Sequence, residues 1–152
     1  MIEQHEHGAA SLDERLRAAR AAQDAGFEVR FRLDPMLLFS GWREAYGEAV
    51  AAVFAHGIRP SRITLGSFRM LGPLRHIIAK RFPESRLLSQ PLEKNGKRLR
   101  YKQEVREQLY AHAVASLRAY DNTVSIALCK ESPELHWVFN GRVDRVRCNC
   151  QA

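Results

Sequence analysis

The sequence predicts an α/β fold with a mainly parallel sheet, followed by a basic β-hairpin and C-terminal helices. Segments with helical periodicity alternate with segments in which apolar and polar residues alternate, and the connections between them are short. The chain has 152 residues, 45% of them hydrophobic, which suits one domain with its own core. No repeat, low-complexity segment or linker divides it, so residues 1–152 are expected to form a single region.

The first two elements are a helix and a strand. Ser11 and Glu14 have the spacing of a capping box, so a helix begins here, and Gly26 is placed to end it in the left-handed conformation. Apolar and charged residues alternate over 27–34, which predicts a strand that Pro35 closes.

A second helix, a second strand and a third helix follow. Apolar residues at helical spacing predict a helix over 42–56. Residues 62–69 read as a strand, in which Gly66 lets the backbone turn or approach another group closely. The third helix runs from about 74 to 81 and stops before Pro83. These β/α units together span residues 11–82.

Residues 92–102 form the predicted hairpin, because an Asn-Gly pair between two extendable segments is the strongest short signal for such a turn. The result is a short, exposed finger, on which Tyr101 offers a flat ring to a base or sugar. Its cations are Lys94, Lys97, Arg98, Arg100 and Lys102. The alternative is a solvated loop whose charges only maintain solubility.

Residues 103–152 are expected to form the C-terminal helices and a tail. A long helix spans 103–120, a strand candidate spans 124–128, and Pro133 opens a final short helix. Two or three strands do not close a sheet, and an open parallel edge this apolar needs a cover. The alternation therefore looks like part of a larger fold or half of an oligomeric one.

The net charge of +7 is unevenly distributed. Residues 59–106 hold thirteen Lys or Arg against three Asp or Glu. Such a block indicates a polyanionic partner, nucleic acid before membrane, since no strongly amphipathic basic helix accompanies it. Electrostatics alone do not separate DNA from RNA.

The sequence gives no sign of export or membrane insertion. It has no run of about 18 uncharged apolar residues, which a membrane span would need. The N-terminus lacks the basic start and apolar stretch of a signal peptide, and three cysteines do not make a disulfide framework. We therefore expect a cytoplasmic protein that makes no membrane contact.

Few residues point to chemistry. Phosphate-binding glycine loops and the common metalloprotease and hydrolase motifs are absent from the sequence. Cys148 and Cys150 would supply only two metal ligands, so a reduced or redox-active pair is preferred to a metal site. Cys129 reads as a packed small hydrophobe. Asp34, at the end of a strand, stands where parallel-sheet proteins place site residues, with a turn-capping role as the alternative.

Several short segments occur in an order and spacing that suggest a family. They are Phe31-Arg32-Leu33-Asp34-Pro35, Gly41-Trp42-Arg43-Glu44-Ala45-Tyr46, Ile63-Thr64-Leu65-Gly66-Ser67-Phe68-Arg69, Arg100-Tyr101-Lys102, Cys129-Lys130-Glu131-Ser132-Pro133-Glu134 and Cys148-Asn149-Cys150. Together, from Ser11 to the end, they resemble the C-terminal part of spore photoproduct lyase and its lyase-like relatives among the radical S-adenosylmethionine enzymes.

The resemblance implies the C-terminal part of a partial (β/α) barrel. Enzymes of this family use a 4Fe-4S cluster, held by Cys-x-x-x-Cys-x-x-Cys, to cleave S-adenosylmethionine, and the radical splits a thymine dimer photoproduct in DNA. By resemblance, Asp34 borders the cofactor pocket, and the finger wedges at the lesion, where cations and a ring can fill the gap that an extruded lesion leaves. The resemblance extends DNA contact to Arg100, Tyr101 and Lys102, and the basic finger adds Lys97 and Arg98 to the expected DNA-binding residues.

The departures from the family are as informative. The chain contains no Cys-x-x-x-Cys-x-x-Cys, and none of its three cysteines matches the family's cluster or catalytic positions. We therefore expect that this chain alone binds no cofactor and is not catalytic, and that it needs the N-terminal half of the barrel in cis or in trans. The alternatives are a non-catalytic nucleic-acid-binding domain and a basic scaffold protein.

Overall fold

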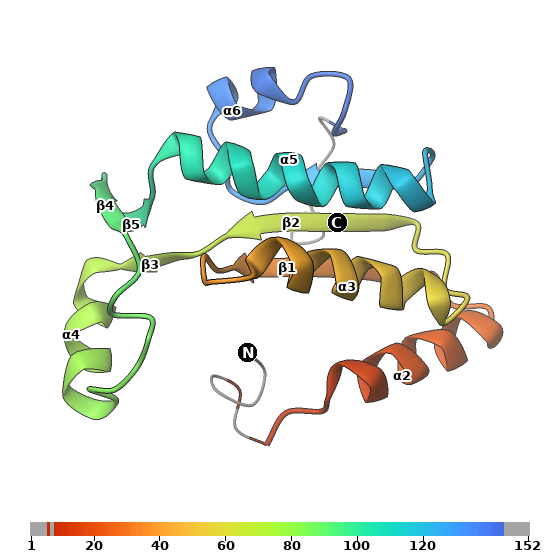
Figure 1. Cartoon of the computed structure of the whole chain (residues 1–152), viewed down its shortest axis with the longest axis horizontal. Coiled ribbons are helices and arrows are strands. Elements are labelled where there is room, and N and C mark those ends of the chain that lie inside the picture. Colours follow the sequence, from red (N-terminus) through yellow and green to blue (C-terminus); the bar gives the residue numbers. More distant parts are fainter. Residues whose placement is uncertain (1–5, 7, 145–152) are drawn as a thin grey trace.

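The computed structural model of the chain describes residue 6 and residues 8–144, and its central feature is a three-stranded parallel sheet (Figure 1). The strands, in the order β1-β2-β6, are β1 (Arg30–Met36), β2 (Arg62–Ser67) and β6 (Ser125–Leu128). In the middle strand, Ile63 pairs with Phe31 on one side and with Ile126 on the other. Because the strands are parallel, their carboxyl ends meet at one edge of the sheet.

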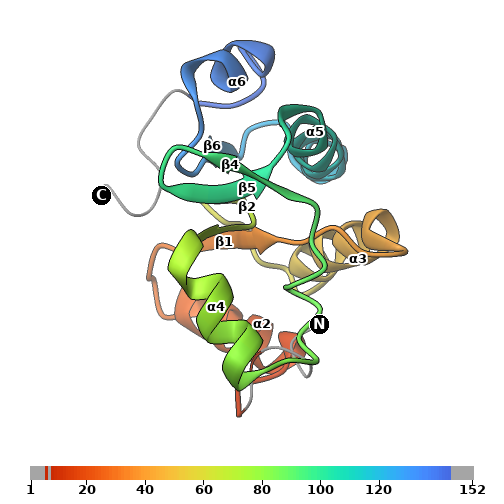
Figure 2. The same ribbon diagram turned by 90° about the vertical axis from the view of Figure 1, so that its left-hand side faces the viewer.

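Four helices surround this sheet. They are α2 (Leu12–Asp24), α3 (Trp42–Ala55), α5 (Gln103–Tyr120) and α6 (Pro133–Val138). Helices α3 and α5 lie on the same side of the sheet, whereas α2 lies beyond β1 and α6 beyond β6 (Figure 2). The core forms between the sheet and α3 and α5, where Leu65, Leu109 and Ile126 are fully buried. A smaller cluster around Leu16 and Ile58 holds α2 against α3.

A second, antiparallel sheet and an exposed helix extend from the carboxyl edge of the first sheet (Figures 1 and 2). This sheet has the order β3-β5-β4. Its strands and the helix are β3 (Arg69–Leu71), α4 (Gly72–Arg81), β4 (Leu92–Asn95) and β5 (Arg98–Tyr101). Asn95 pairs with Arg98, so the turn between β4 and β5 consists of Gly96 and Lys97, and Gly96 has a φ of +60°.

The α/β alternation and the mainly parallel sheet predicted from the sequence are confirmed. Ser11 caps α2 and Glu14 reaches back to its backbone, as the capping box requires. The prediction that Pro35 closes the first strand was wrong: β1 continues to Met36, because a register shift between Leu33 and Met36 places the proline where the ladder of hydrogen bonds is interrupted.

Two further expectations need correction. The stretch predicted as one strand over 62–69 is two strands, β2 and β3, which belong to different sheets. The hairpin turn lies one residue later than the Asn-Gly pair, so glycine occupies the first central position, as in a type II′ turn.

Cys148 and Cys150 lie outside the described residues. In the part of the chain that the structure describes, no helix is long and apolar enough to cross a membrane.

Candidate functional site

Asp34 lies at the carboxyl edge of the parallel sheet, between two arginines. Its side chain is only 11% exposed. Arg32 donates to one carboxylate oxygen at 2.6 Å, and Arg69, which follows β2, donates to both oxygens at 3.3 Å. Burial alone would raise the pKa of Asp34, but the hydrogen bonds and charges of Arg32 and Arg69 outweigh it and lower the pKa. Asp34 is therefore held as a carboxylate.

Gly66 makes room for this carboxylate. A Cβ atom at position 66 would lie 2.5 Å from the carboxyl carbon of Asp34 and 2.6 Å from one of its oxygens. No real Cβ makes such contacts, so only glycine allows Asp34 to lie across the end of β2. The sequence predicted a close approach to this glycine, and the structure identifies Asp34 as the group that approaches.

Cys129 completes the arrangement from the third strand. It follows β6 and is fully buried, as expected for a packed cysteine. Its sulfur atom also accepts hydrogen bonds from Arg32 at 3.3 Å and from Arg69 at 3.5 Å. The two arginines thus connect the carboxyl ends of all three parallel strands, and we call Arg32, Asp34, Arg69 and Cys129 the edge cluster.

A second cluster surrounds the fully buried carboxylate of Glu131. Arg100 lies 2.6 Å from a carboxylate oxygen, and Arg106 donates a short hydrogen bond to the same oxygen. The Tyr110 hydroxyl donates to the other oxygen at 2.6 Å, and the Ser67 hydroxyl does so at 3.3 Å. The cluster thereby ties together β2, β5, α5 and the segment after β6.

The two clusters meet at the second sheet, because Arg69 in β3 pairs directly with Arg100 in β5. One arginine reaches Asp34 and the other reaches Glu131. The Nε atom of Arg100 is buried and has no hydrogen-bond partner among the described residues. Sequence reasoning missed Glu131 and Arg106. The available signal was Arg106 itself, a cation on the inward stripe of α5 that also contains Leu109 and Ala113.

The predicted DNA-binding residues divide into two groups. Lys97, Arg98 and Lys102 are exposed, as expected. Arg100 is only 9% exposed and Tyr101 is fully buried, so the expectation that Tyr101 offers its ring to a base was wrong. The Tyr101 hydroxyl accepts from the Leu38 N–H at 3.0 Å and donates to Gln90. The reason is that β5 runs from the exposed turn into the core, which buries its last two residues.

The described residues contain no group of three or more His, Cys, Asp and Glu that could hold a metal ion. The whole sequence also lacks the three-cysteine motif. These residues therefore do not fit an iron–sulfur cluster. The edge cluster instead consists of a carboxylate and two guanidinium groups that pair with each other beside a buried thiol.

Comparison with known proteins is consistent with these observations. The family model described as "Spore photoproduct lyase" matches residues 1–127. A spore photoproduct lyase from Geobacillus sp. (strain Y412MC61) is 31% identical over 91 residues, which are 57% of this chain and 27% of that protein. The chain therefore matches only about a quarter of that relative's length.

Solved structures show the same fold. Spore photoproduct lyase complexed with dinucleoside spore photoproduct superposes with a TM-score of 0.70 at 23% identity, over 84% of this chain and 40% of that chain. A double mutant of spore photoproduct lyase with bound AdoMet and the same photoproduct gives the same values. A single cysteine-to-alanine mutant gives a TM-score of 0.72 at 23% identity.

Proposed function

The chain belongs to the spore photoproduct lyase family, and from this we propose that it serves as the C-terminal part of a lyase-like radical S-adenosylmethionine enzyme of DNA repair. In this role it supplies contacts to DNA and one wall of the S-adenosylmethionine pocket and is not catalytic alone. The observation that carries the proposal is that the edge cluster and the basic β4–β5 hairpin adjoin, because Arg69 of the cluster pairs with Arg100 in β5.

The DNA contacts are assigned to those of the predicted DNA-binding residues that are exposed, namely Lys97, Arg98 and Lys102. Lysine and arginine at such positions neutralise phosphates and release counterions, which makes binding strong at low salt. Arg100 and Tyr101 position the hairpin for these contacts, because Arg100 forms an ion pair with Glu131 and Tyr101 accepts a hydrogen bond from the Leu38 N–H.

Asp34 is assigned to the wall of the S-adenosylmethionine pocket, together with Arg69. A carboxylate suits the ammonium and hydroxyl groups of such a ligand, and a guanidinium suits its carboxylate. When bound beside a reduced cluster, S-adenosylmethionine supplies the radical on which this family's chemistry depends. The part of Asp34 and Arg69 is to bind and orient it at the carboxyl edge of the sheet, where α/β proteins hold their ligands.

The cluster-binding half of the barrel is proposed to join this chain along β1, in cis or in trans. In the described sheet β1 pairs only with β2, so its other edge is open. A cavity of about 260 Å³ lies between β1, α2 and α3, and its lining includes Leu16, Phe31 and Val53. An added parallel strand and its apolar side chains would satisfy the open edge and fill this space.

Binding of labelled duplex DNA by the full chain, measured by fluorescence anisotropy over a range of salt concentrations, tests the DNA contacts. Substituting Lys97, Arg98 and Lys102 by Gln should make the negative slope of log K against log salt shallower by about 2–3, since each phosphate contact contributes about 0.9 to its magnitude. The matched control, Arg17→Gln with Arg59→Gln and Arg142→Gln, removes the same charge from exposed positions elsewhere and should leave the slope nearly unchanged. Equal slopes for the hairpin variant and the unaltered chain would exclude the hairpin as the contact.

A second candidate function is a nucleic-acid-binding domain without catalysis, for which the exposed hairpin cations would suffice. Joining the chain to the N-terminal half of the Geobacillus relative, followed by cluster reconstitution, distinguishes the two. We expect cleavage of S-adenosylmethionine that Asp34→Asn weakens. DNA binding without any such cleavage by the joined protein would support the second candidate instead.

A further inference from the structure

Helix α4 has an unusual position for a helix of a folded domain, because none of its residues is buried. It begins directly after β3, whose last residue, Leu71, pairs with Arg98 in the hairpin. Ile78 packs partly against the core, and Arg75 donates to the Leu88 carbonyl at 3.4 Å. Helix α4 therefore begins beside the hairpin and extends away from it at the same end of the molecule (Figure 2).

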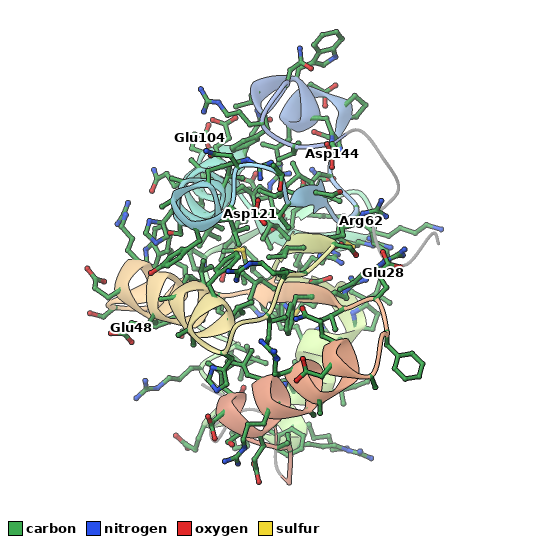
Figure 3. All side chains as sticks on the ribbon, turned by 90° about the vertical axis from the view of Figure 1, so that its right-hand side faces the viewer. Glu28, Glu48, Arg62, Glu104, Asp121 and Asp144 are labelled. Atoms are coloured by element: carbon green, nitrogen blue, oxygen red, sulfur yellow. The ribbon has the colours of Figure 1, made fainter. Side chains whose placement is uncertain are left out.

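This end carries the net charge of the whole protein. Residues 72–102 hold nine of the 24 Lys and Arg but only two of the 17 Asp and Glu, and the remainder of the chain holds fifteen of each. Figure 3 views the opposite end, where Glu28, Asp121 and Asp144 lie around the amino ends of the strands, together with Arg62. The net positive charge thus comes from the segment that contains the hairpin and α4.

Helix α4 and the turn after it contribute four exposed cations to this end: Arg75, Lys80, Arg81 and Arg86. Within the described part of the chain, none of the four forms an ion pair with a carboxylate, whereas arginines such as Arg15, Arg17 and Arg20 are each paired with one. Uncompensated cations gathered at one end of a molecule are the electrostatic footprint of a polyanion-binding protein.

We propose that α4 forms a second contact strip for the sugar-phosphate backbone of duplex nucleic acid, beside the hairpin turn. This inference rests on the proposed function and adds Arg75, Lys80 and Arg81 to the contact surface. These residues bind phosphates and carry no sequence information, so they fix how the duplex lies on the protein while the hairpin reaches the lesion.

The apolar residues of α4 do not favour a protein partner on this surface. Leu74 and Ile77 are about half exposed. Arg81 lies on the same face of the helix, because these three residues follow one another at spacings of three and four positions. Ile77, Lys80 and Arg81 together line a hollow. A protein covering this face would have to bury a guanidinium and an ammonium group with no carboxylate of this chain beside them, which is costly.

The test measures duplex binding by the full chain against salt concentration, with the combined variant Arg75→Gln, Lys80→Gln and Arg81→Gln. We expect the negative slope of log K against log salt to become shallower by about 2–3. The matched control with Arg17, Arg59 and Arg142 changed to Gln removes the same net charge and should keep the slope. Each single substitution should reduce the magnitude of the slope by about 0.9. The single variants therefore test the proposal if circular dichroism shows that the combined variant does not fold.

The outcomes separate the two proposals. If the salt dependence of binding becomes shallower in the hairpin variant but not in the α4 variant, the proposal of a second contact strip is wrong and the proposed function stands. A loss in the α4 variant no larger than that of the control also overturns it, because net charge then explains the effect. If the unaltered chain binds no duplex at all, the proposed function fails and this inference fails with it.

Discussion

Gly66 and Asp34 show how one small residue sets the position of a charged one. Gly66→Ala would place a methyl group 2.5 Å from the Asp34 carboxyl carbon, so either the β2 backbone or the carboxylate must move. We expect a loss of about 1–3 kcal/mol in the free energy of unfolding, as for other overpacked sites. Urea denaturation of a double-mutant cycle with Asp34→Ala checks the cause. The cost of the alanine should largely disappear in the Asp34→Ala background; an equal cost in both backgrounds would mean that the clash is not with Asp34.

The low pKa of Asp34 makes part of the stability dependent on pH. Its folded-state pKa lies below the unfolded value of about 3.9, so the ionised form stabilises the fold at pH values above about 4, and this stabilisation is lost as pH falls through the folded pKa. The difference in unfolding free energy between the unaltered chain and Asp34→Asn should therefore be largest near neutral pH and shrink in acid. Chemical denaturation between about pH 7 and pH 2 measures it. A difference that stays constant over this range would contradict the role of the charge.

At the scale of elements, the hairpin depends on its buried end. Tyr101→Phe removes the hydroxyl that accepts from the Leu38 N–H and donates to Gln90, and leaves that partly buried N–H without this partner. We expect the unfolding free energy to fall by about 1–3 kcal/mol. Tyr120→Phe is the control, because Tyr120 is 55% exposed and its change should cost less than about 0.5 kcal/mol. Equal effects from the two substitutions would show that Tyr101 does not anchor the hairpin.

The elements were largely predictable from the sequence, because each depends on signals a few residues apart. The capping box at Ser11, the helix over 103–120 and the strand alternation before Pro35 all express local periodicity. What the sequence could not reveal depends on contacts between distant residues. Arg100 and Arg106 are buried because Glu131, 31 and 25 positions later in the chain, neutralises them, and no local sequence pattern indicates that pairing.

The same reasoning explains the mixed result for the candidate site. The location of Asp34 at the carboxyl edge of the sheet was predicted from its position at the end of a strand, which is a topological signal that the sequence contains. The division of 62–71 into strands of two different sheets was not foreseeable, since it arises from the pairing of Arg69 with Arg100. Arg100 and Tyr101 are buried in this arrangement, so that only Lys97, Arg98 and Lys102 among the predicted nucleic-acid contacts are exposed.

For the whole molecule, the open edge of β1 predicts uneven protection of the sheet. Strand β2 has a neighbour on both sides, whereas β1 has one neighbour in the described sheet. We expect amide hydrogens of β2, such as that of Leu65, to exchange with solvent far more slowly than the outward-facing amides of β1. Hydrogen exchange followed by mass spectrometry measures this in the full chain. Binding of a cluster-bearing half along β1 should remove the difference, and equal protection of both strands before any such binding would contradict the open edge.

The confinement of charge to residues 72–102 also affects how the protein finds its target. A molecule that is positive at one end and neutral elsewhere is an electric dipole, and the field of a polyanion turns it before the two surfaces touch. Most encounters then begin with the hairpin and α4 facing the duplex, so association is faster than random collision allows and slows sharply as salt screens the field. The uneven charge therefore orients the protein during diffusion, independently of the contacts that form after the protein reaches the duplex.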